Sequence, residues 1–283
     1  MIVIIGGRGR LGQAIARQYG AQEAVCVERS VYGDWARPYD EAPAALDESL
    51  DAFFAPLPRH GASVFVASGL LDPKLSPEKL WNVNFELSRN IVEAGVRHGV
   101  RVTTIGTVME SLLAAHNPYV RSKVALGELV ATHAARGAAV SHVRVHTLYG
   151  GGMPSPFMFL GQMLTALEQG TQFRMTLGKQ LREYHHVDDD ARAFRLLDDA
   201  GVTGVLDLSH GAPVSLADLA RAVFDAAGAS AQLQIGAIPE PLEENYNTVF
   251  ARNPLLKQLA FRDTLPAVLA YLDACGAMRT IQK

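Results

Sequence analysis

The sequence is short of the features that mark secreted, membrane-spanning and nucleic-acid-binding proteins. Its two cysteines, Cys26 and Cys275, are too few for a disulfide framework and indicate a reducing compartment. The apolar run at the N-terminus ends at Gly6, which makes it too short for a signal peptide or a membrane span. The net charge of −3 lacks the basic excess that a general nucleic-acid binder needs. These absences predict a cytoplasmic protein with no membrane or nucleic-acid partner.

A glycine-rich turn is the first positive signal, and it follows the apolar segment 2–5 directly. A helix-like segment at 13–18 comes next, so strand, glycines and helix stand in the order of a dinucleotide-binding site. Glycines permit the tight turn and let backbone N–H groups approach a pyrophosphate at the helix N-terminus. Two glycine frames fit, 7/9/12 and 6/9/12, and a turn that serves packing alone is the other interpretation. The candidate cofactor-binding residues of this turn are Gly6, Gly7, Arg8, Gly9, Arg10, Leu11 and Gly12.

The choice between NAD and NADP depends on a few charged residues. Glu28 follows the apolar run 24–27, about 20 residues after the turn, where a partner for the ribose 2′-hydroxyl belongs. Its carboxylate would repel a 2′-phosphate and therefore favours NAD, whereas Arg8, Arg10 and Arg29 would attract that phosphate and favour NADP. The sequence predicts either cofactor, with a preference for NAD.

Tyr119 and Lys123 are the candidate catalytic pair. Four residues apart on a helix, the two side chains project from one face. A phenol titrates near pH 10, and a nearby ammonium is expected to lower its pKa toward the range in which it exchanges protons. This spacing alone is common, but here it stands in the same chain as the glycine turn.

Strand and helix patterns alternate over the first half of the chain and predict an α/β fold with a doubly wound, Rossmann-type parallel sheet. A turn-rich break at 151–156 separates a dinucleotide-binding domain, residues 1–150, from residues 151–283, which mainly form a small substrate-binding lobe. Segments after residue 150 are expected to complete part of the sheet of the dinucleotide-binding domain. The predicted strands are 2–5, 24–27, 63–67, 101–105 and 139–144, and the predicted helices are 11–19, 46–54, 77–98, 118–135, 187–199, 216–227 and 264–275.

Five further segments carry a family resemblance. In order they are 64–69, 84–94, 103–110, 144–150 and 182–189, the last reading Arg-Glu-Tyr-His-His-Val-Asp-Asp. Together with the turn and the Tyr–Lys pair, they resemble the short-chain dehydrogenase/reductase superfamily. Within it, the chain is similar to the extended branch, the NAD-dependent epimerase/dehydratase family that acts on nucleotide-diphosphate sugars.

The resemblance implies roles for the candidate residues. Tyr119 would exchange a proton with the sugar oxygen while hydride moves to or from nicotinamide C4, and Lys123 would bind the nicotinamide ribose. The family's first hydroxyl position is occupied by Ile105, so Thr107 is the candidate hydroxyl and Thr104 the second choice. The other cofactor contacts implied by the resemblance are Ala67, Ser68, Gly69, Asn84 and His146.

The substrate side is marked by Thr107, Thr147 and Arg182. Thr147 stands where the family often has a substrate-contacting Asn. Arg182 is the candidate ligand of the diphosphate, because a guanidinium can grip phosphate oxygens in bidentate fashion, although a solvated surface arginine is the other interpretation. Dehydratases of the family carry an Asp-Glu pair where this chain has Gly106 and Thr107, which argues against dehydration. Glu110 ends a Met-Glu pair that replaces Tyr-Gly and alters the wall of the sugar pocket.

No metal site is predicted. His185, His186, Asp188 and Asp189 are neighbours in sequence, but adjacent side chains point in different directions and no third spaced ligand appears. Asp188 is interpreted instead as a helix N-cap. The resemblance also implies a homodimer in which the helices of Asn84 and Tyr119 pair between subunits; that these helices merely cover the sheet is the alternative.

Three functions follow from these patterns. The leading one is an oxidoreductase for a nucleotide-linked sugar, specifically a 4-keto-6-deoxy sugar reductase. The second is a 4-epimerase with retained NAD, which uses the same Tyr119–Lys123 pair. The third is a non-catalytic NAD(P)-sensing regulator, and the intact pair argues against it because a sensor needs no proton donor.

Overall fold

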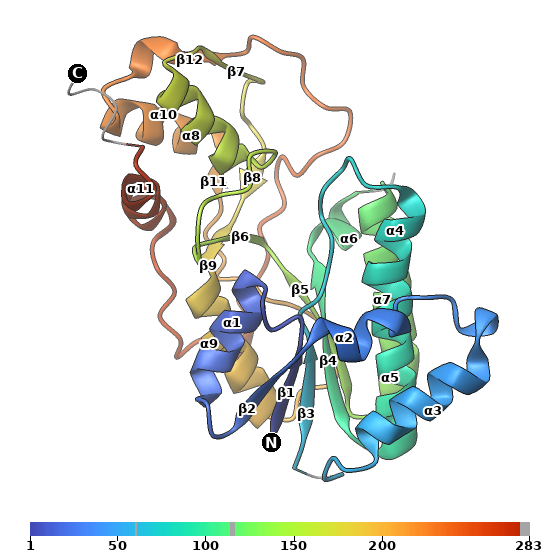
Figure 1. Cartoon of the computed structure of the whole chain (residues 1–283). Helices are drawn as coiled ribbons and strands as arrows, with labels where there is room; N and C mark the ends of the chain where they lie inside the picture. Colours follow the sequence, from blue (N-terminus) through green and yellow to red (C-terminus); the bar gives the residue numbers. More distant parts are fainter. Residues whose placement is uncertain (60, 114–116, 278–283) are drawn as a thin grey trace. The chain divides into compact units, whose positions relative to one another are not determined.

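The computed structural model describes residues 1–59, 61–113 and 117–277. The chain divides into two compact units, which are described separately (Figure 1). Unit 1 comprises Met1–Val145 and Asp190–Leu208, and unit 2 comprises His146–Asp189 and Ser209–Lys283. The chain therefore leaves unit 1 close to the predicted boundary at residue 150 and returns to it once.

Unit 1 is built on a six-stranded sheet in the order β10-β5-β4-β3-β1-β2, and every strand pair is parallel. The predicted Rossmann-type doubly wound sheet is therefore confirmed. Sequence order reverses between β1 and β3, and such a switch point opens a ligand-binding crevice at the carboxyl ends of the strands. The strands are β1 Ile2–Ile5, β2 Ala24–Val27, β3 Ser63–Val66, β4 Arg101–Thr107, β5 Val140–Val145 and β10 Gly204–Asp207.

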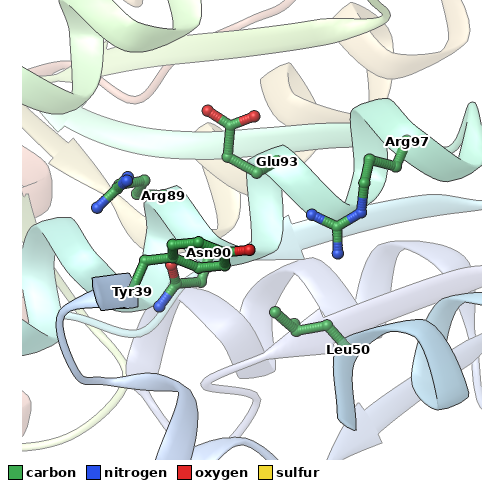
Figure 2. Close-up of a pocket in the computed structure, with 6 residues that line it drawn as sticks. All are labelled: Tyr39, Leu50, Arg89, Asn90, Glu93 and Arg97. Carbon is green, nitrogen blue, oxygen red and sulfur yellow. The ribbon is translucent and has the colours of Figure 1, made fainter. Parts of the chain in front are cut away.

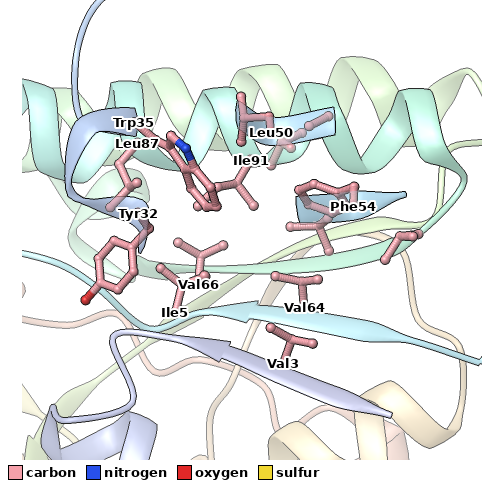
Figure 3. Close-up of a cluster of buried hydrophobic side chains, with 14 of the residues drawn as sticks. Val3, Ile5, Tyr32, Trp35, Leu50, Phe54, Val64, Val66, Leu87 and Ile91 are labelled. Atoms are coloured by element: carbon pink, nitrogen blue, oxygen red, sulfur yellow. The ribbon is translucent and has the colours of Figure 1, made fainter. Parts of the chain in front are cut away.

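Helices cover both faces of this sheet. One face carries α3, α5 and α7, and its apolar core includes Val3, Phe54, Val64 and Ile91 (Figure 3). The other face carries α1 and the second part of α9, where the Phe65 ring lies 6.0 Å from Tyr19 and 6.2 Å from Phe194. The helices are α1 Arg10–Tyr19, α2 Arg29–Tyr32, α3 Pro43–Phe54, α4 Pro77–Trp81, α5 Leu87–His98, α6 Met109–Leu112, α7 Pro118–Ala135 and α9 Val187–Asp199.

Most of these bounds agree with the sequence patterns, with one informative exception. The segment predicted as a single helix over 77–98 contains a π-helical turn, η3 Asn82–Glu86, between α4 and α5. Such turns insert one extra residue and often occur at functional sites. The 30–49 stretch folds into α2, two 3₁₀ turns (Gly33–Trp35 and Tyr39–Glu41) and the start of α3.

In the described part of unit 2, short two-stranded sheets and the helices α8 Phe159–Gln169, α10 Leu216–Ala226 and α11 Thr264–Ala274 surround a separate apolar core. Met163, Leu219, Phe224 and Val268 are fully buried in this core. Of the helices in this unit, α8 was not predicted from the sequence. The strand pairs of unit 2 are β6 Thr147–Tyr149 with β9 Tyr184–His186, β8 Leu181–Arg182 with β11 Val214–Ser215, and β7 Phe173–Met175 with β12 Leu233–Ile235. No helix among the described residues has the length and apolar character needed to span a membrane.

Candidate active site

The glycine turn joins β1 to α1 at the switch point of the sheet. Gly6 has φ +82°, a left-handed conformation that favours glycine, and a Cβ there would lie 2.5 Å from the backbone nitrogen of Ser68. A Cβ on Gly12 would lie 2.4 Å from the Gly6 carbonyl oxygen. Gly7 faces β2 instead, where its Cβ would meet Cys26 Sγ at 2.5 Å. The close approach of backbone at 6 and 12 leaves a cradle without side chains at the N-terminus of α1, which fits a pyrophosphate.

The end of β3 lies beside this turn and beside α7, the helix of the candidate catalytic pair. Asn84, in the π-helical turn, is fully buried, and its side chain closes the loop after β3 by accepting from Leu70 N at 2.8 Å and donating to Leu70 O at 2.9 Å. A Cβ on Gly69 would lie 3.3 Å from Asn84 Oδ1 and 3.9 Å from Lys123 Nζ. The structure thus brings together three predicted site positions, Gly69, Asn84 and Lys123, and gives Asn84 a defined task in shaping the loop.

The predicted ribose-binding carboxylate, Glu28, stands at the end of β2 as the residue before α2. Its side chain is exposed and forms an ion pair with Arg8 of the glycine turn. One of the arginines that would attract a 2′-phosphate is therefore bound to the acid that would repel it. This geometry is compatible with either cofactor.

Tyr119 and Lys123 both lie in the N-terminal half of α7. The helix is capped by Asn117 Oδ1, which accepts from Val120 N at 2.9 Å. Lys123 is buried, and its Nζ donates to the carbonyl oxygen of Ile105 on β4 at 2.7 Å. The helix face therefore meets the carboxyl end of a central strand, as the resemblance implies.

The surroundings of Tyr119 include influences that the sequence argument did not weigh. Burial raises the pKa of the Tyr119 phenol above its usual value, and the charge of Glu110 raises it further. Burial lowers the pKa of Lys123 to about 8, while Glu110 acts in the opposite sense. The neighbouring carboxylate was not weighed in the sequence argument, and it changes the electrostatics of the pair.

The two candidate hydroxyls differ in accessibility. Thr104 is fully buried, and its Oγ1 lies 2.8 Å from His142 Nδ1 and 3.2 Å from the Ser141 carbonyl oxygen. Thr107 is partly exposed at the end of β4, where its Oγ1 accepts from Met109 N at 3.4 Å. Of the two, Thr107 is the hydroxyl that a substrate can reach.

A buried polar network lies behind the end of β4, and the sequence did not reveal it. His142 Nε2, on β5, lies 3.1 Å from Glu110 Oε2, and Thr107 N donates to Glu110 Oε1 at 2.6 Å. The Glu110 side chain is only 5% exposed and that of His142 is fully buried. Glycines make the necessary room, because a Cβ on Gly106 would lie 2.2 Å from His142 Nε2 and one on Gly127 would lie 3.2 Å from Glu110 Oε2.

Three predicted site residues, Thr147, Arg182 and His146, belong to unit 2. Thr147 begins β6 and is half-buried, with its N–H donating to the Glu183 carbonyl oxygen at 3.2 Å. Arg182, on β8, forms an ion pair with Glu244 and donates to its own neighbour Leu181 O at 2.9 Å. A diphosphate bound by Arg182 would therefore share the guanidinium with Glu244 or displace it.

His146, predicted to contact the cofactor, lies in a buried cluster of unit 2. The carboxylate of Glu183 accepts from Ser209 Oγ at 2.7 Å and from His210 N at 2.8 Å, and lies 3.0 Å from His185 Nε2. Burial lowers the pKa of His146 to about 3, so its ring is neutral at physiological pH. Burial alone would raise the pKa of Glu183, but the hydrogen bonds and neighbouring imidazoles hold it below its usual value.

This cluster contains a set of metal-ligating side chains that the sequence argument did not consider. Ligand atoms of Glu183, His185 and His210 all lie within 4.8 Å of one another. The rings of His185 and His210, however, are stacked with centroids 4.6 Å apart and planes 27° apart. The ring lone pairs lie in two stacked planes and therefore do not readily meet at a common point, whereas hydrogen bonds to the Glu183 carboxylate are already formed, so the geometry is that of a hydrogen-bonded cluster around a carboxylate.

The N-cap assigned to Asp188 is also corrected. Helix α9 begins at Val187, and His186 Nδ1 accepts from Asp188 N at 3.2 Å. The His186 imidazole therefore accepts one of the N–H groups that are left without partners at the helix N-terminus, and Asp188 lies inside the first turn.

A separate pocket lies between α5 and the residues Tyr39 and Leu50 (Figure 2). It contains none of the predicted site residues, and two of its members are already tied to carboxylates or carbonyls. Arg97 lies 2.9 Å from Asp47, and Asn90 Nδ2 donates to Trp35 O at 2.9 Å. The lining residues are Tyr39, Leu50, Arg89, Asn90, Glu93 and Arg97.

The parallel sheet, the glycine turn at its switch point and the Tyr119–Lys123 helix define the class of protein: a dinucleotide-dependent enzyme of the short-chain dehydrogenase/reductase type. The family model described as the NAD-dependent epimerase/dehydratase family matches residues 2–205. The chain belongs to this family.

Solved structures support the same fold. A dTDP-glucose 4,6-dehydratase from Streptomyces venezuelae is 16% identical, with 96% of this chain and 95% of that chain covered and a TM-score of 0.72. A UDP-N-acetylglucosamine 4-epimerase from Bacillus cereus is 18% identical, with 98% and 99% covered and a TM-score of 0.68. A dTDP-4-dehydrorhamnose reductase from Clostridium acetobutylicum is 16% identical, with 97% and 99% covered and a TM-score of 0.69. A comparison with curated proteins found no match.

Proposed function

We propose that this protein is an NAD(P)-dependent reductase of a nucleotide-linked 4-keto sugar, in which Tyr119 supplies the proton and Lys123 holds the nicotinamide ribose. The observation that carries the proposal is the position of Lys123, whose Nζ bonds the β4 carbonyl at 2.7 Å beside Gly69 and Asn84. When bound, the nicotinamide supplies the hydride. Thr107, at the exposed end of β4, would orient the sugar oxygen that Tyr119 protonates.

Reduction is favoured over dehydration because of what β4 lacks. Dehydration needs further acid and base groups at the end of this strand, and Gly106 occupies one of those positions. A side chain there has no room, since its Cβ would lie 2.4 Å from Glu110 Oε1. Thr107, at the other position, carries no ionisable group. The two positions therefore carry no carboxylate, and the nearby carboxylate of Glu110 is buried and hydrogen-bonded to Thr107 N and His142.

NAD is the preferred cofactor in this proposal. Glu28 stands at the end of β2, where a carboxylate accepts from a ribose 2′-hydroxyl and opposes a 2′-phosphate. The dehydratase from Streptomyces venezuelae was solved with NAD. Arg8 pairs with Glu28, and this pairing reduces the free positive charge available to a phosphate.

The proposed partners are a nucleotide-diphosphate sugar and a second copy of the chain. Arg182 would bind the diphosphate and Thr147 would contact the sugar. The relatives named above include proteins described as acting on UDP- and dTDP-linked sugars, which supports this substrate class. The homodimer and a cytoplasmic location follow from the sequence argument and are kept as parts of the proposal.

Tyr119→Phe is the direct test. It should lower reduction of 4-keto nucleotide sugars by NADH about 10²–10⁴-fold, the range for loss of a general acid, while NADH binding changes little. The assay follows reduced-nicotinamide absorbance against a panel of UDP- and dTDP-linked sugars, and Tyr39→Phe on unit 1 is the matched control. Unchanged turnover in Tyr119→Phe would remove the mechanism. Interconversion of two sugars without net absorbance change would make the protein an epimerase, and cofactor binding without turnover of any sugar would make it a regulator.

A further inference from the structure

The catalytic helix α7 has a third position in the stripe that begins with Tyr119 and Lys123. Gly127 lies one turn beyond Lys123 on the same face, and a Cβ there would lie 3.2 Å from Glu110 Oε2. The Glu110 carboxylate thus packs against the turn of helix next to the candidate catalytic pair. On the strand side, a Cβ on Gly106 would collide with the same carboxylate at 2.4 Å. Two glycines, one on each element, leave space for one acid.

The Glu110 carboxylate is buried, and its partners fix it in place. It accepts from Thr107 N at 2.6 Å and lies 3.1–3.2 Å from His142 Nε2. A buried carboxylate is tolerated only with such partners. If the Thr104 hydroxyl donates to His142 Nδ1, 2.8 Å away, the neutral ring donates its Nε2–H to Glu110, and each of these contacts has a donor.

Lys123 needs a counter-charge because it is buried. Burial lowers its pKa to about 8, and Glu110 is the charged group that opposes this shift among the residues the structure describes. The other groups near the ammonium are neutral: the Ile105 carbonyl on β4, Asn84 in the π-helical turn and Gly69 after β3. Tyr119 on α7 is held in its neutral form by burial, and His142 on β5 faces Glu110.

We infer that Glu110 is a positioning residue of the active site: its buried carboxylate keeps Lys123 in the ammonium form and holds the end of β4 that presents Thr107. The inference rests on the proposed function for its catalytic consequence, but the charge of Lys123 can be measured without any substrate.

Geometry places the acid near this lysine. Lys123 Nζ bonds the carbonyl of Ile105. The Glu110 carboxylate borders both the next residue after Ile105, Gly106, and Gly127, one turn from Lys123. Because a nearby opposite charge favours the ammonium form, removal of the carboxylate should lower the midpoint of Lys123.

The experiment follows the lysine side chains of the full chain by NMR across pH, with ¹³C at Cε. The chain has six lysines, and Lys123→Arg assigns the resonance of interest. Glu110→Gln is nearly isosteric and can still accept from Thr107 N. The Lys123 midpoint of this variant should lie below that of the wild-type protein, because the ammonium has lost its counter-charge. An unchanged midpoint in folded Glu110→Gln would overturn the inference, since a merely structural role would leave the titration in place.

Two further variants make the result specific. Glu93→Gln removes the carboxylate of another Glu–His pair, 3.0 Å from His133 on the same helix α7, and should leave the Lys123 midpoint unchanged. Glu110→Asp keeps the charge but withdraws it by one methylene, so it should give a smaller fall in the same direction. Should Glu110→Gln not fold, Glu110→Asp decides the question, and no fall in that variant overturns the inference.

Activity measurements separate this inference from the proposed function. If the Lys123 midpoint falls in Glu110→Gln while wild-type protein turns over no sugar, the assignment of Glu110 holds and the proposed reaction fails. If the wild-type protein is a reductase and the Lys123 midpoint does not move in Glu110→Gln, the proposed reaction holds and the assignment of Glu110 fails. If both hold, Glu110→Gln should lose at least about tenfold in kcat/KM at pH 8 and less at pH 6, where more Lys123 is protonated.

Discussion

Each unit of this protein buries a glutamate against at least one histidine, yet the two acids, Glu110 and Glu183, have different surroundings. In unit 1, Glu110 meets one imidazole and one backbone N–H, and its charge acts on Lys123. In unit 2, Glu183 receives a hydroxyl and a backbone N–H from the segment around Ser209 and an imidazole from β9. The first acid serves a nearby ammonium, and the second joins two chain segments.

The difference shows that residue types alone do not define a site. Both clusters hold groups that bind protons, and the cluster of unit 1 lies at the end of a central strand, beside the helix of the candidate catalytic pair. The cluster of unit 2 has its hydrogen bonds directed inward, to Glu183. Substitutions that weaken each acid in turn should therefore give opposite patterns of stability loss and charge change.

Glu183→Gln should have the largest effect on stability. An amide cannot accept from the Ser209 hydroxyl, His210 N and His185 together, so at least one buried donor loses its partner, at a cost of about 2–4 kcal/mol. Glu110→Gln should cost only about 1 kcal/mol, because Gln still accepts from Thr107 N and the His142 tautomer can change. Urea unfolding gives both values, and hydrogen exchange should place the loss for Glu183→Gln at β9 and residues 209–212. Equal losses of stability in Glu183→Gln and Glu110→Gln would contradict the different roles given to the two acids.

Gly106→Ala should have the next largest effect. Its Cβ would lie 2.2 Å from His142 Nε2 and 2.4 Å from Glu110 Oε1, and forcing these groups apart costs about 1–3 kcal/mol. The same variant should disturb the Lys123 titration. Gly33→Ala is the matched control, because Gly33 has φ −61° and its Cβ would meet no atom closer than 3.9 Å. If Gly106→Ala leaves the free energy of unfolding unchanged, the side chains of Glu110 and His142 can shift without loss of stability.

The pH dependence of unit 2 should be the smallest effect. The pKa of His146 is depressed in the folded protein, to about 3, whereas an unfolded histidine titrates near 6.5. Its contribution to stability is therefore full above about pH 6.5 and is lost as pH falls from there toward 3, by about 1 kcal/mol at pH 5.5. His146→Gln should reduce this loss when urea unfolding is compared at pH 7.5 and 5.5. A steeper loss in the variant would contradict the assignment.

Local patterns predicted much of unit 1. The β1–turn–α1 unit, the bounds of α7 and the parallel order of strands follow from apolar runs, glycines and an Asn-Pro helix start, all signals within a few residues. Helix α8 was missed because the turn-rich break at 151–156 obscured its start. The π-helical turn at Asn84 was missed because the periodicity of a helix changes little when one residue is inserted.

The polar networks could not be predicted, for a different reason. Glu110 and His142 lie 32 positions apart and meet only because Thr104 on β4 pairs with His142 on β5. That register depends on the whole sheet and leaves no local pattern. The sequence did mark Glu110 as a departure from the family, which was the available signal, but it gave no sign of the charge that Tyr119 would feel. Arg182 likewise appeared free to bind phosphate until the fold placed Glu244 beside it.

The two glycines that face Glu110 also limit how this site can change over generations. Because Gly106 and Gly127 border the same buried acid, a larger residue at either position is acceptable only after the acid or His142 has become smaller. If a glycine were enlarged first, its side chain would collide with the acid or with His142, and the protein would be less stable. A lineage that gained a larger residue at either glycine is therefore expected to have shortened the acid or the histidine first, and the four positions should be inherited or replaced as a set.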